Sequence, residues 1–233
     1  MSQLDQMNKY LQEVKEKIEP SQYQKQDIKK RVDRVRQTLE RDIPYVDGSK
    51  YSSKTYLHGS WKRRTQIRKS LDDRWDVDIL AVIGGCVPSD HHLSGEPLST
   101  PSSALRTIKK HLDNFFQNEI AQDKPCITIK YKSDNFDLEI MPIYFGNPEV
   151  YNYDYHIVMI PNYNLKSWNG HFPFRFGRIL MQDNKKYKNF PITLIKLIKH
   201  WNNQNGKLMS GYDIELLTIF FFNELESIGN PPL

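Results

Sequence analysis

The order of apolar patterns along the chain predicts an α+β protein with two lobes. Apolar residues recur at helical spacing near the start, strand-like apolar runs occupy the middle, and helical patterns return toward the end. With 233 residues, the chain is long enough for one large domain or two small lobes. We therefore expect N-terminal helices over 1–45, a core with a mixed β-sheet over 46–160, and a helical lobe over 161–233.

The first forty residues contain two helical patterns. Apolar side chains recur at helical spacing over 4–18, and Pro20 and Ser21 then break the helix. A second helix follows, because residues 28–39 place their apolar side chains on one face and charged side chains on the other.

Three segments in the middle of the chain are typical of strands. Residues 76–83 predict a buried strand with an acidic start, and residues 126–131 and 136–141 alternate between apolar and polar side chains. The turn residues at 133–135 separate the last two strands, which predicts a hairpin.

The remaining segments predict loops and helices. Residues 84–101 form a loop rich in Gly, Pro and Ser, and a helix begins near Ser102 or Ser103, either of which can cap it. The segment 142–175 is aromatic and without regular periodicity. Three helices are expected after it, with Pro191 in the first turn of the second and an almost continuously apolar, buried third helix: 176–186, 191–203 and 212–228.

Composition restricts the partners and the compartment. The net charge of +5 favours an anionic partner, for which nucleotides suffice. No apolar run is long enough to span a bilayer and no secretory signal is visible, so we expect no membrane partner. Two cysteines, Cys86 and Cys126, make no disulfide framework, which predicts the reducing cytoplasm.

Two short motifs carry the functional signal. Gly59-Ser60 at a turn offers backbone N–H groups and a hydroxyl to phosphate oxygens. Asp76 and Asp78 flank one residue of a strand, so both carboxylates lie on one face of it. Two carboxylates beside a phosphate-binding turn can hold magnesium against a triphosphate, which points to nucleotidyl transfer.

A two-metal reaction of this kind needs at least three carboxylates. The third must come from an adjacent strand, and the strand at 136–141 offers Asp137 and Glu139, which lie on the same face of it. We therefore expect two ions of Mg²⁺ or Mn²⁺, held by Asp76, Asp78 and one of these two residues.

These motifs together resemble the DNA polymerase beta-type nucleotidyltransferase superfamily. The resemblance rests on Gly59-Ser60, Thr65, Asp76-Val77-Asp78 and the run Glu139-Ile140-Met141-Pro142. The C-terminal half narrows it, because the runs at 195–202 and 210–216 resemble the helical lobe of the cGAS/DncV-like nucleotidyltransferases. These are bacterial relatives of cyclic GMP-AMP synthase and oligoadenylate synthase. The resemblance implies a catalytic lobe with a mixed sheet over 46–160 and a helical C-terminal lobe.

The resemblance also implies roles for individual residues. Metal ligation falls to Asp76, Asp78 and Glu139; Glu139 stands where the family usually has an aspartate, and register favours it over Asp137. Nucleotide contacts, made through the triphosphate and by base stacking, fall to six residues: Gly59, Ser60, Thr65, Lys199, Ser210 and Tyr212.

The chain departs from the family pattern at three places. Gly211 separates Ser210 from the aromatic Tyr212, and Arg64 replaces a common glycine. The family normally carries more helices after the one at 212–228, so we expect either a fragment or a minimal helical lobe. In a fragment, the apolar face of 212–228 would be partly uncovered.

The resemblance implies a synthase that makes a cyclic di- or trinucleotide second messenger in bacterial anti-phage defence of the CBASS type. Its substrates would be nucleoside triphosphates: ATP, with GTP or a pyrimidine triphosphate as alternatives. A downstream effector would bind the product, and no nucleic acid would be required. The alternatives are an RNA-tailing or CCA-adding nucleotidyltransferase, which would need an extended basic surface, and a nucleotide sensor with an inactive site. The intact carboxylates argue against the sensor.

Overall fold

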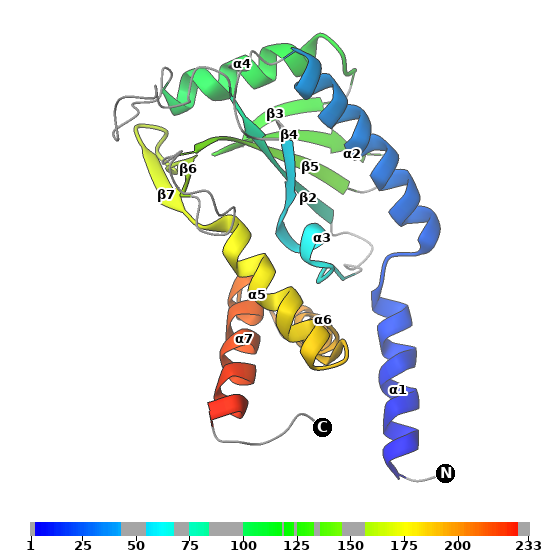
Figure 1. The fold of residues 1–233 in the computed structure, drawn as a ribbon. Helices are drawn as coiled ribbons and strands as arrows, with labels where there is room; N and C mark the ends of the chain where they lie inside the picture. The colour runs from blue at the N-terminus through cyan, green and yellow to red at the C-terminus, as the bar shows by residue number, and fades with distance from the viewer. Residues whose placement is uncertain are drawn as a thin grey trace. The chain divides into compact units, whose positions relative to one another are not determined.

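The fold was analysed in a computed structural model, shown in Figure 1. The described residues are 3–42, 55–67, 75–83, 100–117, 119–123, 125–132, 136–145 and 157–227. Most of the loop expected over 84–101, the turn at 133–135 and Cys86 therefore lie outside the described residues. The chain forms two compact units. A sheet unit comprises Gln26–Gly59 and Arg74–Phe176, and a helical unit comprises Met1–Lys25, Ser60–Asp73 and Gly177–Leu233.

The sheet unit is built on a mixed β-sheet, as predicted (Figure 1). Five strands are ordered β1-β2-β5-β4-β3, with β6 paired to β5 and β7 paired to β6. Strands β2 and β5 run parallel, and the other neighbours run antiparallel. The expected hairpin is confirmed as β4 and β5. The bounds are β1 Thr55–His58, β2 Trp75–Val82, β3 Glu119–Asp123, β4 Cys126–Tyr131, β5 Phe136–Phe145, β6 Val158–Pro161 and β7 Trp168–His171.

The segment 142–175, expected to be irregular, contains regular structure. Strand β5 continues to Phe145, and β6 and β7 form a second hairpin. Each of these two strands has only four residues, too few to display a period in the sequence. Side-chain hydrogen bonds close their connection: Asn162 Nδ2 donates to Ser167 Oγ at 2.6 Å, and the Lys166 amide donates to Asn162 Oδ1 at 3.0 Å.

One face of the sheet forms the main core. Because side chains alternate along a strand, the residues that follow the acidic positions of β2 and β5 point to the opposite face. These side chains are fully buried: Val77, Ile79, Leu138 and Ile140, together with Ile127 and Ile129 of β4. Helices α2 (Gln22–Asp42) and α4 (Pro101–Asp113) run along the sheet, with their apolar stripes buried. The core therefore fixes which face the acidic residues occupy.

Helix α4 begins slightly earlier than predicted. Thr100, not Ser102 or Ser103, is the N-cap, and its hydroxyl accepts a hydrogen bond from the Ser103 amide at 3.2 Å. Pro101 then occupies the first turn, where its missing N–H costs nothing.

The helical unit contains the expected helices. Helices α6 and α7 pack against each other, and α1 packs against α6. Pro191 lies in the first turn of α6, as predicted. The bounds are α1 Gln3–Ile18, α3 Gly59–Arg63, α5 Pro173–Lys186, α6 Phe190–Gln204 and α7 Gly211–Ser227. Among the described ranges, no helix is both long enough and apolar enough to cross a bilayer.

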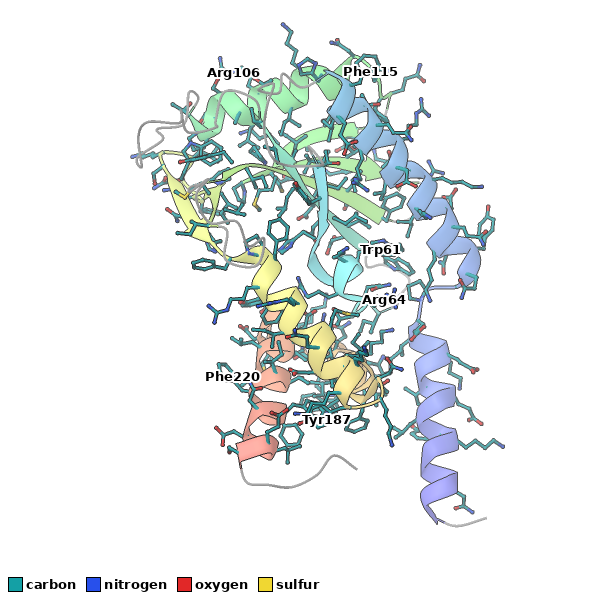
Figure 2. All side chains as sticks on the ribbon, viewed as in Figure 1. Trp61, Arg64, Arg106, Phe115, Tyr187 and Phe220 are labelled. Atoms are coloured by element: carbon teal, nitrogen blue, oxygen red, sulfur yellow. The ribbon has the colours of Figure 1, made fainter. Side chains whose placement is uncertain are left out.

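Helix α7 is buried on one face only, contrary to the prediction of a buried helix. Ile214, Glu215 and Phe222 are buried, whereas Leu217, Phe220 and Phe221 are at least half exposed (Phe220 is labelled in Figure 2). The apolar residues surround the helix almost evenly, so the sequence pattern cannot distinguish the covered face from the exposed one.

The cap of α4 gives a direct test of the fold. We expect Thr100→Ala to lower the free energy of unfolding by about 1 kcal/mol, because the Ser103 amide loses its acceptor. Ser102→Ala is the matched control and should change it by less than about 0.5 kcal/mol, as an exposed side chain outside the cap. Urea denaturation measures both, and equal losses would contradict the assignment.

Candidate active site

The parallel pairing of β2 with β5 brings the predicted carboxylates side by side. Asp76 is registered with Asp137, and Asp78 is registered with Glu139. Registered residues on neighbouring strands share a face and lie on backbones about 4.8 Å apart. All four acids therefore occupy one face of the sheet, where Asp76 is exposed and the other three are partly buried. The strand that offers Asp137 and Glu139 is therefore adjacent to β2, as expected, and the role of either residue as the third metal ligand stays a prediction.

Gly59 contacts one of these carboxylates closely. It follows β1 directly, has a φ of +63°, and lies so near Asp78 that a Cβ at this position would be 1.7 Å from Asp78 Oδ2. His58, the residue before it, is registered with Asp78 across the β1–β2 pair. Two independent reasons therefore favour glycine at this position: the left-handed backbone and the carboxylate beside it.

The carboxylates on the acidic face act on each other's ionisation. Burial, followed by the charges of Asp78 and Asp76, raises the pKa of Glu139 to about 7. The same charges act on the buried thiol of Cys126: burial, followed by the Glu139 charge, raises the pKa of this thiol to about 12. Like charges gathered on one face disfavour each other's ionisation, and a bound cation would reverse that effect.

The donor set fits a divalent cation. Asp76, Asp78 and Glu139 supply carboxylate oxygens, the ligands that Mg²⁺ and Mn²⁺ prefer. Within the described ranges, no three acidic, histidine or cysteine side chains are gathered closely enough to hold an ion as they stand. Holding a metal therefore requires these side chains to turn toward a common point on the face they already share.

The turn after Gly59 belongs to the helical unit from Ser60 onward. It closes with a hydrogen bond from the Thr65 amide to the Ser60 carbonyl at 3.0 Å. Arg64, which replaces the family's common glycine, has a φ of 59°, so the backbone keeps the left-handed conformation that glycine favours. Figure 2 labels Trp61 and Arg64 at this short helix and turn.

Thr65 and Lys199 meet at a buried carboxylate that the sequence motifs did not single out. Glu215 of α7 is completely buried and accepts hydrogen bonds from Thr65 Oγ1 at 2.5 Å and Lys199 Nζ at 2.6 Å. Its other oxygen accepts from Arg63 Nε at 2.5 Å. Burial opposes ionisation of Glu215, but the charges of Lys199 and Arg63 outweigh it and keep its pKa below the usual range. An acid inside an apolar helical run is the signal that could have revealed it.

Ser210 and Tyr212 stand at the start of α7. The Asp213 amide donates to Ser210 Oγ at 3.1 Å and the Ser210 amide donates to Asp213 Oδ2 at 3.3 Å, the reciprocal pattern of a capping box. Tyr212 is 53% exposed. Gly211, the departure from the family pattern, lies close to the lysine: a Cβ there would be 3.2 Å from Lys199 Cε.

The predicted site residues thus fall into two groups. The sheet unit gathers Gly59, Asp76, Asp78 and Glu139, and the helical unit holds Ser60, Thr65, Lys199, Ser210 and Tyr212. Within the helical unit, Thr65 and Lys199 are joined directly, since Lys199 Nζ also donates to Thr65 Oγ1 at 3.3 Å. The roles of both groups toward a nucleotide remain predictions.

The mixed sheet with this acidic register has the fold of a nucleotidyltransferase, and comparison with known proteins identifies the family. The model of the Second Messenger Oligonucleotide or Dinucleotide Synthetase domain matches residues 1–184. The chain therefore belongs to this family, the cGAS/DncV-like nucleotidyltransferases, as the sequence motifs indicated.

Two curated relatives are similar in sequence. A cyclic AMP-AMP-AMP synthase of an Acinetobacter species is 25% identical over 186 residues, covering 77% of this chain and 49% of the relative. A probable cyclic nucleotide synthase of Bacillus cereus is 23% identical over 186 residues, covering 70% and 54%. The chain thus spans about half the length of the curated relatives it matches.

Solved structures share the fold. Escherichia coli DncV, in its 3′-deoxy GTP-bound form, matches with a TM-score of 0.67 and 12% identity, covering 90% of this chain and 70% of DncV. CdnC of Escherichia coli MS115-1, solved with ATP, matches with a TM-score of 0.63 and 15% identity, covering 90% of this chain and 63% of CdnC.

The contact between Gly59 and Asp78 predicts the effect of one methyl group. Gly59→Ala should destabilise the protein by more than the roughly 1–2 kcal/mol that a left-handed backbone costs an alanine, because the methyl group also collides with Asp78. Gly206→Ala is the matched control, with a φ of +86° and nothing within 4 Å of its Cβ. Urea denaturation measures the difference, and equal losses would show that Asp78 can simply move aside.

Proposed function

We propose that this protein is a cyclic oligonucleotide synthase that joins nucleoside triphosphates into a cyclic di- or trinucleotide. The observation that carries the proposal is the register of β2 and β5, in which Asp78 lies beside Glu139 and Asp76 beside Asp137 on one open face. Family membership supports it, and so do the names of the two curated relatives, a cyclic AMP-AMP-AMP synthase and a probable cyclic nucleotide synthase.

In this proposal Asp76, Asp78 and Glu139 hold two ions of Mg²⁺ or Mn²⁺. Such ions would neutralise charge on the triphosphate and activate the attacking hydroxyl. Gly59 and Ser60 hold the triphosphate through backbone N–H groups and the serine hydroxyl. The family resemblance adds Thr65, Lys199 and Ser210 to the triphosphate contacts and Tyr212 as the residue that stacks on a base.

The proposed substrates are ATP and a second triphosphate, either GTP or a pyrimidine nucleotide. Two of the matched structures support a nucleotide of this kind, since CdnC was solved with ATP and DncV with 3′-deoxy GTP. The proposed setting is anti-phage defence of the CBASS type in the bacterial cytoplasm, with a downstream effector that binds the cyclic product.

Synthesis from free nucleotides tests the function directly. We expect the purified protein, with the four nucleoside triphosphates and Mg²⁺ or Mn²⁺, to form a small product that resists phosphatase, because ring closure removes every terminal phosphate. No primer, template or RNA should be needed. If the protein instead extends added RNA by single nucleotides and makes no phosphatase-resistant species, the RNA-tailing alternative replaces this proposal.

The carboxylates give the test of mechanism. Asp76→Asn combined with Asp78→Asn should abolish product formation while the circular dichroism spectrum is retained, since the metal ligands are lost and each replacement keeps the size of the side chain. Initial rates should fall by orders of magnitude for Glu139→Gln and far less for Asp137→Asn, its matched control on the same strand and face. The reverse ranking would make Asp137 the third ligand.

A further inference from the structure

We propose that Glu215 is a positioning residue for nucleotide binding, acting through Thr65, Arg63 and Lys199. The inference rests on the proposed function, because it concerns the residues that would hold the triphosphate. Neither the family motifs nor the comparisons assign a role to Glu215.

Glu215 joins three parts of the helical unit that are far apart in sequence. From α7 it binds Arg63 and Thr65, in and just after α3, and Lys199 of α6. Each of these partners is itself buried. Thr65 closes the turn by donating its amide to the Ser60 carbonyl, and Lys199 Nζ approaches the Thr65 carbonyl at 3.4 Å. Moving Glu215 would therefore disturb the backbone that presents Ser60.

Lys199 also lies close to the start of α7. A Cβ on Gly211, the first residue of that helix, would be 3.2 Å from Lys199 Cε and 3.4 Å from Lys199 Nζ. The ammonium thus donates to the Glu215 carboxylate and lies near the start of the helix that follows Ser210. One carboxylate consequently fixes both the turn after Ser60 and the lysine.

Stability alone is a poor account of this cluster. Buried ion pairs are often replaced by apolar side chains of similar volume without loss of stability, because desolvation offsets the attraction between the charges. The Thr65 side chain is fully buried, so it has no exposed atom that could contact a ligand. Its hydroxyl donates a hydrogen bond to Glu215. Its place in the motif is explained if it acts through Glu215.

The same unit supplies a matched control. Glu19, just after the end of α1, accepts hydrogen bonds from Lys196 Nζ at 2.7 Å and from Lys25 Nζ at 3.3 Å. Lys196 is a buried lysine on α6, one turn before Lys199. Glu19→Gln therefore removes a carboxylate paired with two cations, one of them a buried lysine of the same helix, without touching the 60–65 segment.

The test compares melting temperature, KM and kcat for ATP with Mg²⁺ in Glu215→Gln and Glu19→Gln. We expect both variants to melt earlier. Only Glu215→Gln should raise KM, with kcat/KM falling by about a hundredfold, as a displacement of about 1 Å in a positioning group can cause. Glu19→Gln should leave KM and kcat nearly unchanged. If both variants melt earlier and neither changes KM, Glu215 is structural only and the proposal fails.

A second pair of variants keeps the test decisive if Glu215→Gln does not fold. Thr65→Val should raise KM, and Thr65→Ser, which keeps the hydroxyl, should restore it. Where the double variant Thr65→Val with Glu215→Gln folds, its KM should be no higher than that of Glu215→Gln alone, because the two substitutions break the same contact. The proposal would be overturned if the increases in KM of the two single variants multiplied in the double variant, or if Thr65→Val left KM unchanged.

Binding of a non-hydrolysable ATP analogue, measured by calorimetry, separates this inference from the proposed function. If the wild-type protein binds the analogue but makes no cyclic product, the proposed function fails, and weaker binding by Glu215→Gln still supports the positioning role. If the wild type makes the product and Glu215→Gln binds the analogue equally well, the positioning role fails alone.

Discussion

The parallel pairing of β2 with β5 is the constraint on which the candidate site depends. It places two pairs of acidic residues side by side, Asp76 with Asp137 and Asp78 with Glu139, although like charges at neighbouring positions destabilise a sheet. The register is held from the other face, where Val77, Ile79, Leu138 and Ile140 are completely buried. A slip of one residue would turn these side chains outward and the acids inward. The apolar core therefore maintains an acidic arrangement that would not persist by itself.

Much of this arrangement could be predicted because it depends on local periodicity. The alternation of β2 and β5 fixed the faces of Asp76, Asp78 and Glu139, and the short turn between β4 and β5 indicated their hairpin. The pairing of β2 with β5 is a long-range contact, and local periodicity does not predict which strand lies beside β2. Chemistry supplied the missing information, because a third carboxylate had to lie beside the first two and the acidic strand β5 could provide it.

Other features could not be predicted because they are set by contacts distant in sequence. The burial of Glu215 depends on Arg63 and Thr65, about 150 positions away, so the sequence of its own helix did not indicate a partner. Helix α7 is apolar on nearly all sides, so its sequence does not indicate which face is exposed. The cap of α4 is a different case, because the deciding signal is local: Pro101, next to Thr100, belongs in the first turn of a helix and so places the cap at Thr100.

The buried charges of the two units have different neighbours: like charges in the sheet unit and opposite charges in the helical unit. On the sheet, burial and the repulsion between carboxylates raise the pKa of Glu139 to about 7, so the face attracts a cation. In the helical unit, burial lowers the pKa of Lys199, and the Glu215 carboxylate counteracts that shift. Without this carboxylate a lysine so buried would tend to lose its proton, and with it any attraction for phosphate. Glu215 thus acts on the pKa of Lys199, which it raises against the effect of burial, as well as on the position of the lysine.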